Sequence, residues 1–108
     1  MAEPTFDVDG YPTEETLERL RTWPITDAAA ALDFVAAAWH WPNGVSRELR
    51  LQEAELLFWK PSDRFLRFAT GGWSGNESLI DALKQSQVAA LTWRLSSAGG
   101  LHIFQYPG

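Results

Sequence analysis

The sequence has no cysteine and only two histidines among its 108 residues. Without cysteine the chain can form neither a disulfide framework nor a thiolate site, which suits a reducing compartment. The histidines, His40 and His102, have no second ligand three or four positions away, so we expect no metal site. A Walker loop is also missing, because Glu77 stands where that loop needs a lysine, and we expect no cofactor.

Long apolar runs and an excess of positive charge are missing too. No stretch approaches the roughly 20 apolar residues that cross a bilayer, and the acidic start MAEPTFDVDG lacks the apolar core of a signal peptide. Nine Lys and Arg against 14 Asp and Glu give a formal net charge of −5. This balance disfavours nucleic-acid backbones, and the acids are too dispersed to mimic DNA. We therefore expect a cytoplasmic protein with neither a membrane nor a nucleic-acid partner.

Apolar and aromatic residues are abundant. Hydrophobic residues make up 45% of the chain, which includes six Trp and six Phe. This composition and length predict one domain with its own core, and aromatic surface in excess of what the core requires. Pro4, Gly10 and Pro12 mark residues 1–12 as an irregular arm, so the domain is expected to span residues 13–108.

Two helices are predicted near the N-terminus. Thr13 can cap a short helix that ends at the WP pair of residues 23–24. The alanine-rich segment from Asp27 to the PNG of residues 42–44 predicts a second helix. Phe34 and Trp41 form an apolar stripe on this helix that is separate from its main buried stripe, so we consider it a candidate partner surface.

The remaining chain predicts a mainly antiparallel sheet of two hairpins, with four to five strands and a connecting helix over 75–85. The first hairpin would pair ELLFWK with RFLRFAT around PSD, and the second would pair VAALTWRL with LHIFQY, with Leu95 opposite Leu101. Residues 45–53 fit a strand or a helix, and we favour a short strand. Adjacent strands with added helices indicate an α+β domain.

The turn FATGGWSGNE (68–77) fits a catalytic motif or a helix cap. GWSGN resembles the nucleophile elbow G-x-S-x-G, but Asn76 replaces its last glycine and no parallel sheet is expected to carry a triad, so we predict no catalytic residues. A capping box with Ser74 and Glu77 explains the residues better. Trp73 would then be a core anchor or an exposed binding residue.

Two further groups of candidate binding residues follow from this pattern. Trp73, Ser74, Gly75 and Asn76 could hold a sugar or an anion at the start of the connecting helix. One face of the second hairpin, with Arg94, His102, Phe104 and Tyr106, mixes aromatic and polar side chains and is a binding surface unless a helix covers it.

The segments ELLFWKPSDRFLRFATGGWSGNESLIDAL (55–83) and TWRLSSAGGLHIF (92–104) resemble a family of small, uncharacterised bacteriophage and prophage proteins. FATGGWSGNE and the closing GGLHIF are its characteristic elements, and the similarity covers roughly the C-terminal half of the chain. The family offers no functional residues to carry over. What the resemblance implies is a context, an accessory protein made inside an infected or lysogenic bacterium.

The sequence hypothesis is therefore a non-catalytic accessory protein that binds a host or phage protein and inhibits a host defence system or host enzyme. A second copy of the chain is a further candidate partner. The first alternative is a domain that binds a sugar or an anion through Trp73–Asn76, and the second is a small serine-type hydrolase.

Overall fold

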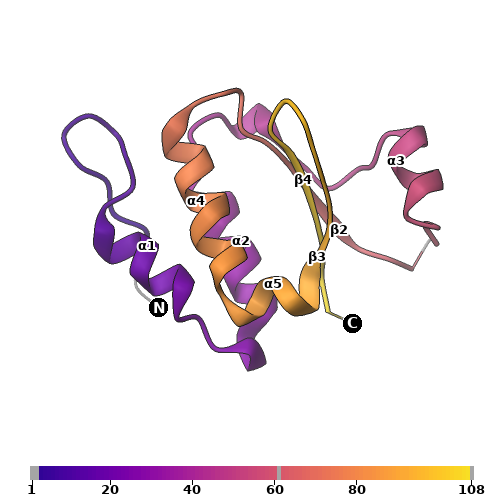
Figure 1. Cartoon of the computed structure of the whole chain (residues 1–108), viewed down its shortest axis with the longest axis horizontal. Helices are drawn as coiled ribbons and strands as arrows, with labels where there is room; N and C mark the ends of the chain where they lie inside the picture. Colours follow the sequence, from indigo (N-terminus) through magenta and orange to yellow (C-terminus); the bar gives the residue numbers. More distant parts are fainter. Residues whose placement is uncertain (1–2, 61, 108) are drawn as a thin grey trace.

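A four-stranded antiparallel sheet forms the centre of the protein in the computed structural model, which describes residues 3–60 and 62–107 (Figure 1). The spatial order of the strands is β1-β2-β4-β3, and their bounds are β1 Val45–Ser46, β2 Phe65–Ala69, β3 Trp93–Ser97 and β4 Leu101–Gln105. Together with the helices, this sheet confirms the predicted α+β class.

Helices lie on both sides of the sheet. In the described residues they are α1 Glu14–Arg21, α2 Ala28–Ala38, α3 Leu51–Leu56, α4 Ser74–Gln85 and α5 Gln87–Thr92, with 3-10 turns at Ile25–Asp27 and Pro42–Gly44. Helices α2, α4 and α5 cover one face, α1 packs on α4, and α3 stands apart on the other side (Figure 1).

The two N-terminal helices confirm the signals in the sequence. The Thr13 side chain caps α1 by accepting a hydrogen bond from the amide of Thr16 at 3.3 Å. Helix α2 ends where Trp39 adopts an extended backbone, just before the PNG segment. Residues 3–12 of the expected irregular arm are more ordered than predicted, because an isolated bridge between Phe6 and Pro12 closes them into a loop; residues 1–2 lie outside the described residues.

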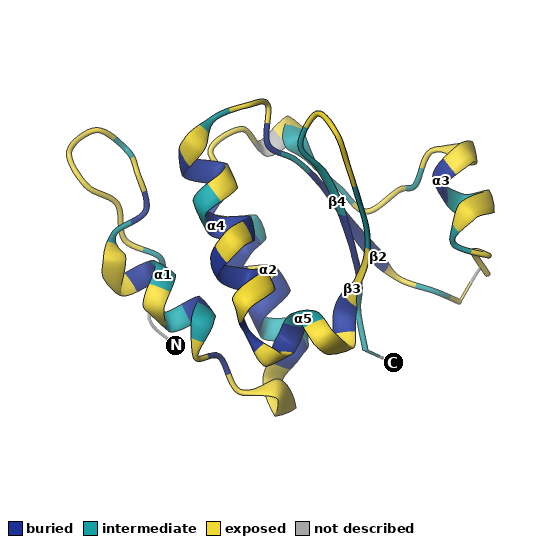
Figure 2. Ribbon diagram, in the orientation of Figure 1, coloured by how far each residue is buried: buried dark blue, intermediate teal, exposed yellow. Residues whose placement is uncertain are grey.

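The core lies between the sheet and helices α2 and α4 (Figure 2). Side chains alternate between the faces of a strand, so Leu66, Phe68 and Phe104 point toward the helices while Phe65 and Ile103 point away. All five are buried, and the first three join the helical core residues in one cluster. The packing of these three side chains against the helices therefore determines which face of the sheet the helices cover.

The predicted first hairpin is wrong. RFLRFAT does form β2, but its neighbours are β4 and β1, both antiparallel, and ELLFWK instead supplies the end of α3 and a turn. Long-range strand pairs thus replace the local pair that the sequence suggested. Only Val45–Ser46 of the predicted 45–53 strand is extended, and Pro61 of the expected PSD loop lies outside the described residues.

The second hairpin is present with a different register. Leu101 pairs with Ser97 and not with the predicted Leu95. The loop is therefore shorter than the expected SSAGG, because Gly99 and Gly100, at φ 90° and 85°, allow a tighter turn. An irregularity between Trp93 and Leu95 then shifts the rest of the strand. The VAALT part of the predicted strand is the short helix α5, which starts after an extended Ser86.

Candidate binding surfaces

The turn between β2 and α4 is held by hydrogen bonds within the protein. Thr70 is fully buried, and its amide donates to the carbonyl of Gly100 at 3.0 Å. Its carbonyl accepts from the amide of Trp73 at 3.2 Å and from the Nδ2 of Asn76 at 3.3 Å. The Thr70 hydroxyl accepts from the amide of Gly72 at 3.3 Å. The polar groups of this turn therefore form hydrogen bonds that stabilise the turn itself.

Asn76 joins the turn to the end of α2. It is fully buried, and its Oδ1 accepts a hydrogen bond from the amide of His40 at 3.0 Å. Its two side-chain atoms thus connect two segments that are distant in sequence. Because a buried amide without partners is costly, these bonds account for an asparagine at this position.

The glycines make room for tryptophan rings. Gly71 has φ 64°, and a Cβ there would lie 2.5 Å from the Trp41 ring. A Cβ on Gly75 would overlap the Trp73 ring. Both positions require a residue without a side chain, so the glycines are explained by aromatic packing and not by a bound phosphate.

Four rings form an aromatic cluster of Tyr11, His40, Trp41 and Trp73. The Trp73 ring stacks on His40 at 4.3 Å between centroids, lies 5.0 Å from Tyr11 and meets Trp41 edge-on at 6.2 Å. Tyr11 and Trp41 are 39% and 43% exposed, whereas Trp73 is half-buried. Trp73 therefore anchors the cluster, and the outer rings carry its exposed surface.

The predicted capping box is wrong, because helix α4 begins one residue earlier than that interpretation requires. Trp73 is the N-cap, and the amide of Glu77 donates to the Trp73 carbonyl at 3.1 Å. Ser74 is exposed in the first turn, and its hydroxyl donates to the Tyr11 hydroxyl at 3.4 Å. Among the described residues no hydrogen bond joins Ser74 to either histidine.

Several predicted binding residues are buried. Phe34 lies in the core under α2 at 6% exposure, Phe104 is fully buried under the helices, and Gly75 and Asn76 are buried in the turn. The hairpin face that contains Phe104 is thus covered by helices. Phe34, one of the two residues of the predicted apolar stripe on the second helix, belongs to the core. Trp41 alone of that stripe is exposed.

The other hairpin residues are engaged within the protein. Arg94 donates from Nε to Gln105 at 2.9 Å, and the Nδ1 of His102 lies 2.7 Å from the Ser96 hydroxyl. Burial, followed by the charge of Lys84, lowers the pKa of His102, although Asp81 acts in the opposite direction.

Tyr106 lies in a network of its own, away from Arg94 and His102. Its hydroxyl donates to Asp33 and accepts from the Nη1 of Arg47 at 2.9 Å. Burial, reinforced by the hydrogen bond to Asp33, raises the pKa of Tyr106. The four predicted hairpin residues therefore do not form one exposed surface.

A surface that the sequence did not predict lies on residues 47–60, which we call the α3 arm. Four apolar residues of the arm are exposed: Leu51 by 76%, Leu56 by 67%, Phe58 by 86% and Trp59 by 48%. An open groove of about 500 Å³ runs beside them and is lined by Arg47, Glu48, Leu49, Leu51, Ala54, Trp59 and Asp63. Clustered exposure of this kind is typical of interaction sites.

An ion pair attaches the arm to the sheet. The Glu53 carboxylate accepts from the Nε of Arg67 on β2 at 2.9 Å and from the amide of Arg50 at 3.0 Å. The side chains of Glu53 and Arg67 are only 10% and 15% exposed. The arm is therefore fastened by its charged side and exposes its apolar side.

The end of α3 has an unusual residue in a common motif. The amide of Trp59 donates to Ala54 at 2.9 Å and that of Phe58 to Glu55 at 3.3 Å, which is the Schellman pattern. Phe58 occupies the position where this motif normally has glycine, and its φ is 52°. A bulky side chain is disfavoured in this left-handed region.

Comparisons with protein-family models, with curated proteins and with solved structures find no match for the chain. Within residues 3–60 and 62–107, no group of three acidic or histidine side chains is placed to hold a metal ion. No helix in the same residues is both long and apolar enough to cross a membrane.

Proposed function

We propose that the protein is a non-catalytic phage or prophage accessory protein that binds a host or phage protein through the α3 arm. Its place of action is the host cytoplasm, where it inhibits a host defence system or a host enzyme. The observation that carries the proposal is Phe58, a phenylalanine that is 86% exposed in a left-handed backbone conformation.

Phe58 contributes little to the stability of the free protein. An exposed ring gains almost nothing from the hydrophobic effect, and the left-handed conformation costs a non-glycine residue about 1 to 2 kcal/mol. Glycine or asparagine would satisfy the same turn at lower cost. A ring in this place is explained if it contributes to binding, since Phe and Trp supply much of the energy of protein interfaces.

The arm is also suited to presenting these side chains. Phe58 and Trp59 are held in place before a partner binds, both by the ion pair of Glu53 and Arg67 and by the Schellman hydrogen bonds at the end of α3. Such preorganisation reduces the entropy lost on binding. The groove beside the arm is lined by one basic side chain, Arg47, and two acidic ones, Glu48 and Asp63, so it disfavours a strongly acidic partner.

The partner that fits this surface is a protein with an apolar groove. Phe58 and Trp59 would enter that groove, and an apolar side chain of the partner would enter the space lined by Leu49 and Leu51. Nucleic acid fits poorly, because the protein has a net charge of −5. A non-catalytic role is supported by Ser74, whose hydroxyl is bonded to Tyr11.

The sugar or anion site at Trp73–Asn76 finds less support. Gly75 and Asn76 are buried, and the Trp73 ring already contacts His40 and Tyr11. A ligand would have to displace these rings before it could stack on Trp73.

The test compares Phe58→Ser with Val8→Ser as a matched control, because Val8 is 100% exposed in the N-terminal loop. A partner captured from host lysate is identified, purified and titrated against each variant by calorimetry. We expect Phe58→Ser to weaken binding about thirtyfold, the effect of losing a hot spot worth about 2 kcal/mol, and Val8→Ser to leave it unchanged.

Equal affinity of the two variants would refute the role of the arm. Sedimentation of the purified protein tests whether a second copy of the chain binds the α3 arm instead. If the wild-type chain forms a dimer that Phe58→Ser dissociates, the arm binds a second copy and the proposal of a foreign partner is wrong.

A further inference from the structure

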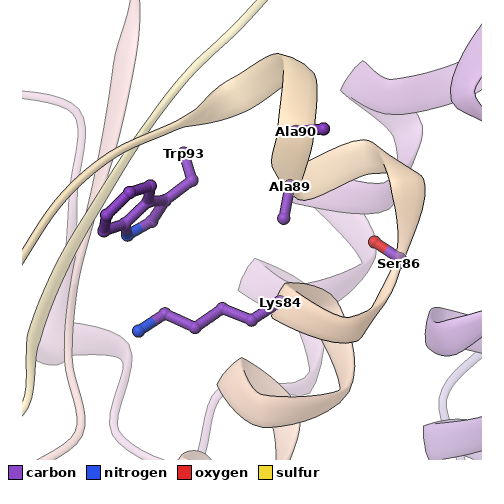
Figure 3. A pocket seen from close by; sticks show the side chains of 5 residues that line it. All are labelled: Lys84, Ser86, Ala89, Ala90 and Trp93. Carbon is purple, nitrogen blue, oxygen red and sulfur yellow. The ribbon is translucent and has the colours of Figure 1, made fainter.

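An open pocket of about 440 Å³ lies between the end of α4, helix α5 and the start of β3 (Figure 3). Its lining consists of Lys84, Ser86, Ala89, Ala90 and Trp93. The pocket therefore combines a cation, an aromatic ring, a hydroxyl and two small apolar side chains. Its volume falls within the range of pockets that take small organic ligands.

The Trp93 ring is fixed in position although it is 44% exposed. Its Nε1 donates to the hydroxyl of Ser96 at 2.8 Å, and that hydroxyl lies 2.7 Å from the Nδ1 of His102. Burial lowers the pKa of His102, which favours its neutral ring, and a neutral ring with its proton on Nε2 accepts the serine proton at Nδ1. The indole N–H is therefore occupied, and the ring face is what remains for a ligand.

Lys84 supplies positive charge beside this ring. Its Nζ lies 5.7 Å from the centroid of the Trp93 ring, and its side chain extends beneath the indole (Figure 3). Among the described residues no carboxylate lies within 4.0 Å of it, although Asp81 is one turn earlier on α4. An anion placed here would gain a charge pair that the protein itself does not provide.

Ser86 restricts the chemistry at the other end of the pocket. Its hydroxyl proton is donated to the carbonyl of Leu83 at 2.6 Å, and the residue is 6% exposed. The oxygen can still accept a hydrogen bond, so a ligand group that meets it must be a donor. Ala89 points toward the space between Trp93 and Lys84 (Figure 3). Because the Lys84 ammonium lies over the Trp93 ring, a flat ring can stack on the indole only when the flexible lysine side chain moves to the edge of the ring.

We propose that this pocket binds a planar aromatic carboxylate that also has an N–H or O–H donor. The ligand ring stacks on Trp93, its carboxylate pairs with Lys84, and its donor reaches Ser86. The α3 arm takes no part in this site, so the inference stands or falls independently of the proposed function.

The probe is indole-3-carboxylate, with indole-3-carboxamide as its neutral counterpart and 1-methylindole-3-carboxylate as the counterpart without the N–H donor. Binding is followed through the indole N–H signals of the six tryptophans in two-dimensional NMR spectra. The spectrum of Trp93→Phe assigns the Trp93 signal. Lys84→Met tests the charge pair, and Lys60→Met is the matched control, because Lys60 lies in the α3 arm and is the other lysine of the chain.

We expect a saturable shift of the Trp93 signal with a dissociation constant of about 1 mM, as suits a ligand of this size. Lys84→Met should weaken the carboxylate about fivefold and the amide not at all, whereas Lys60→Met should change neither. The N-methyl compound should bind more weakly than the parent, because it loses the hydrogen bond to Ser86.

Three results would overturn the inference. The first is the absence of saturation at 20 mM probe, about twentyfold above the expected dissociation constant. The second is an equal loss of affinity in Lys84→Met and Lys60→Met. The third is a uniform shift of all six indole signals, which would indicate non-specific association.

Discussion

Replacement of Phe58 by glycine should stabilise the free protein while it weakens binding of the proposed partner about thirtyfold. Most substitutions that remove a large apolar side chain destabilise a protein, so the expected sign is unusual. It follows from two features of this residue, its 86% exposure and its φ of 52° at the end of α3. Phe58→Ala is the matched control, because it removes the same ring and keeps the disfavoured conformation.

The magnitude can be worked from these features. About one seventh of Phe58 is buried, so loss of the ring costs about 0.4 kcal/mol of the roughly 3 kcal/mol for complete burial. Glycine removes about 1 to 2 kcal/mol of backbone strain and adds about 0.5 kcal/mol of unfolded-state entropy. Phe58→Gly should therefore gain about 0.5 kcal/mol, and Phe58→Ala should lose about 0.4 kcal/mol.

Urea denaturation of the wild type and both variants measures the free energies of unfolding. Hydrogen exchange at the amides of Phe58 and Trp59, which donate to Glu55 and Ala54, reports on the turn itself. Exchange there should be slower in Phe58→Gly than in Phe58→Ala. If glycine destabilises the protein by more than about 1 kcal/mol, or changes its stability as alanine does, then either the small contribution of the Phe58 ring or the cost of its backbone conformation is wrong. The explanation from backbone strain is then refuted.

Three further predictions concern the fold. Asn76→Asp replaces the buried donor to the Thr70 carbonyl with a charge, so urea titrations should show a loss of about 3 kcal/mol at pH 7 that shrinks at pH 4; equal losses would contradict it. Gly100→Ala would overlap the Thr70 hydroxyl whereas Gly99→Ala would meet open space, so thermal unfolding should show losses of about 3 and 1 kcal/mol; equal losses would count against the packing. Burial lowers the pKa of His102 below its ordinary value of 6.5, so the unfolded chain binds more protons and stability falls as pH drops through 6.5 toward the lower folded pKa. His102→Gln should flatten this decline in denaturation midpoints between pH 7.5 and 5, and an unchanged slope would show that other groups cause it.

Local signals in the sequence predicted the helices well. The Thr13 cap, the alanine-rich helix α2 and the connecting helix α4 are all confirmed. Each depends on residues within one or two turns of each other, where sequence spacing determines spatial proximity.

Strand pairing could not be predicted in the same way. RFLRFAT was correctly assigned as a strand, but its partners, β1 and β4, are not the segment next to it. The start of α4 also depended on distant residues. Asn76 bonds to the amide of His40 and thereby links α4 to the end of α2, which the spacing of Ser74 and Glu77 could not reveal.

The α3 arm was not predicted from the sequence, because the burial of its side chains is the reverse of what their polarity suggests. Apolar periodicity assigns Leu51, Leu56 and Phe58 to a core and Glu53 to the surface. In the structure Glu53 is 7% exposed and the three apolar residues face solvent. The only indication in the sequence was that residues 45–53 fitted both a helix and a strand.

The residues that look most distinctive in the sequence are therefore those that the fold itself explains. Gly75 makes room for Trp73, Asn76 connects two segments, and Thr70 satisfies the backbone of the turn. A pattern such as FATGGWSGNE can be characteristic without containing a binding site. Phe58 is the opposite case, because neither packing nor backbone conformation favours it. The binding role that we propose for the α3 arm would account for its presence.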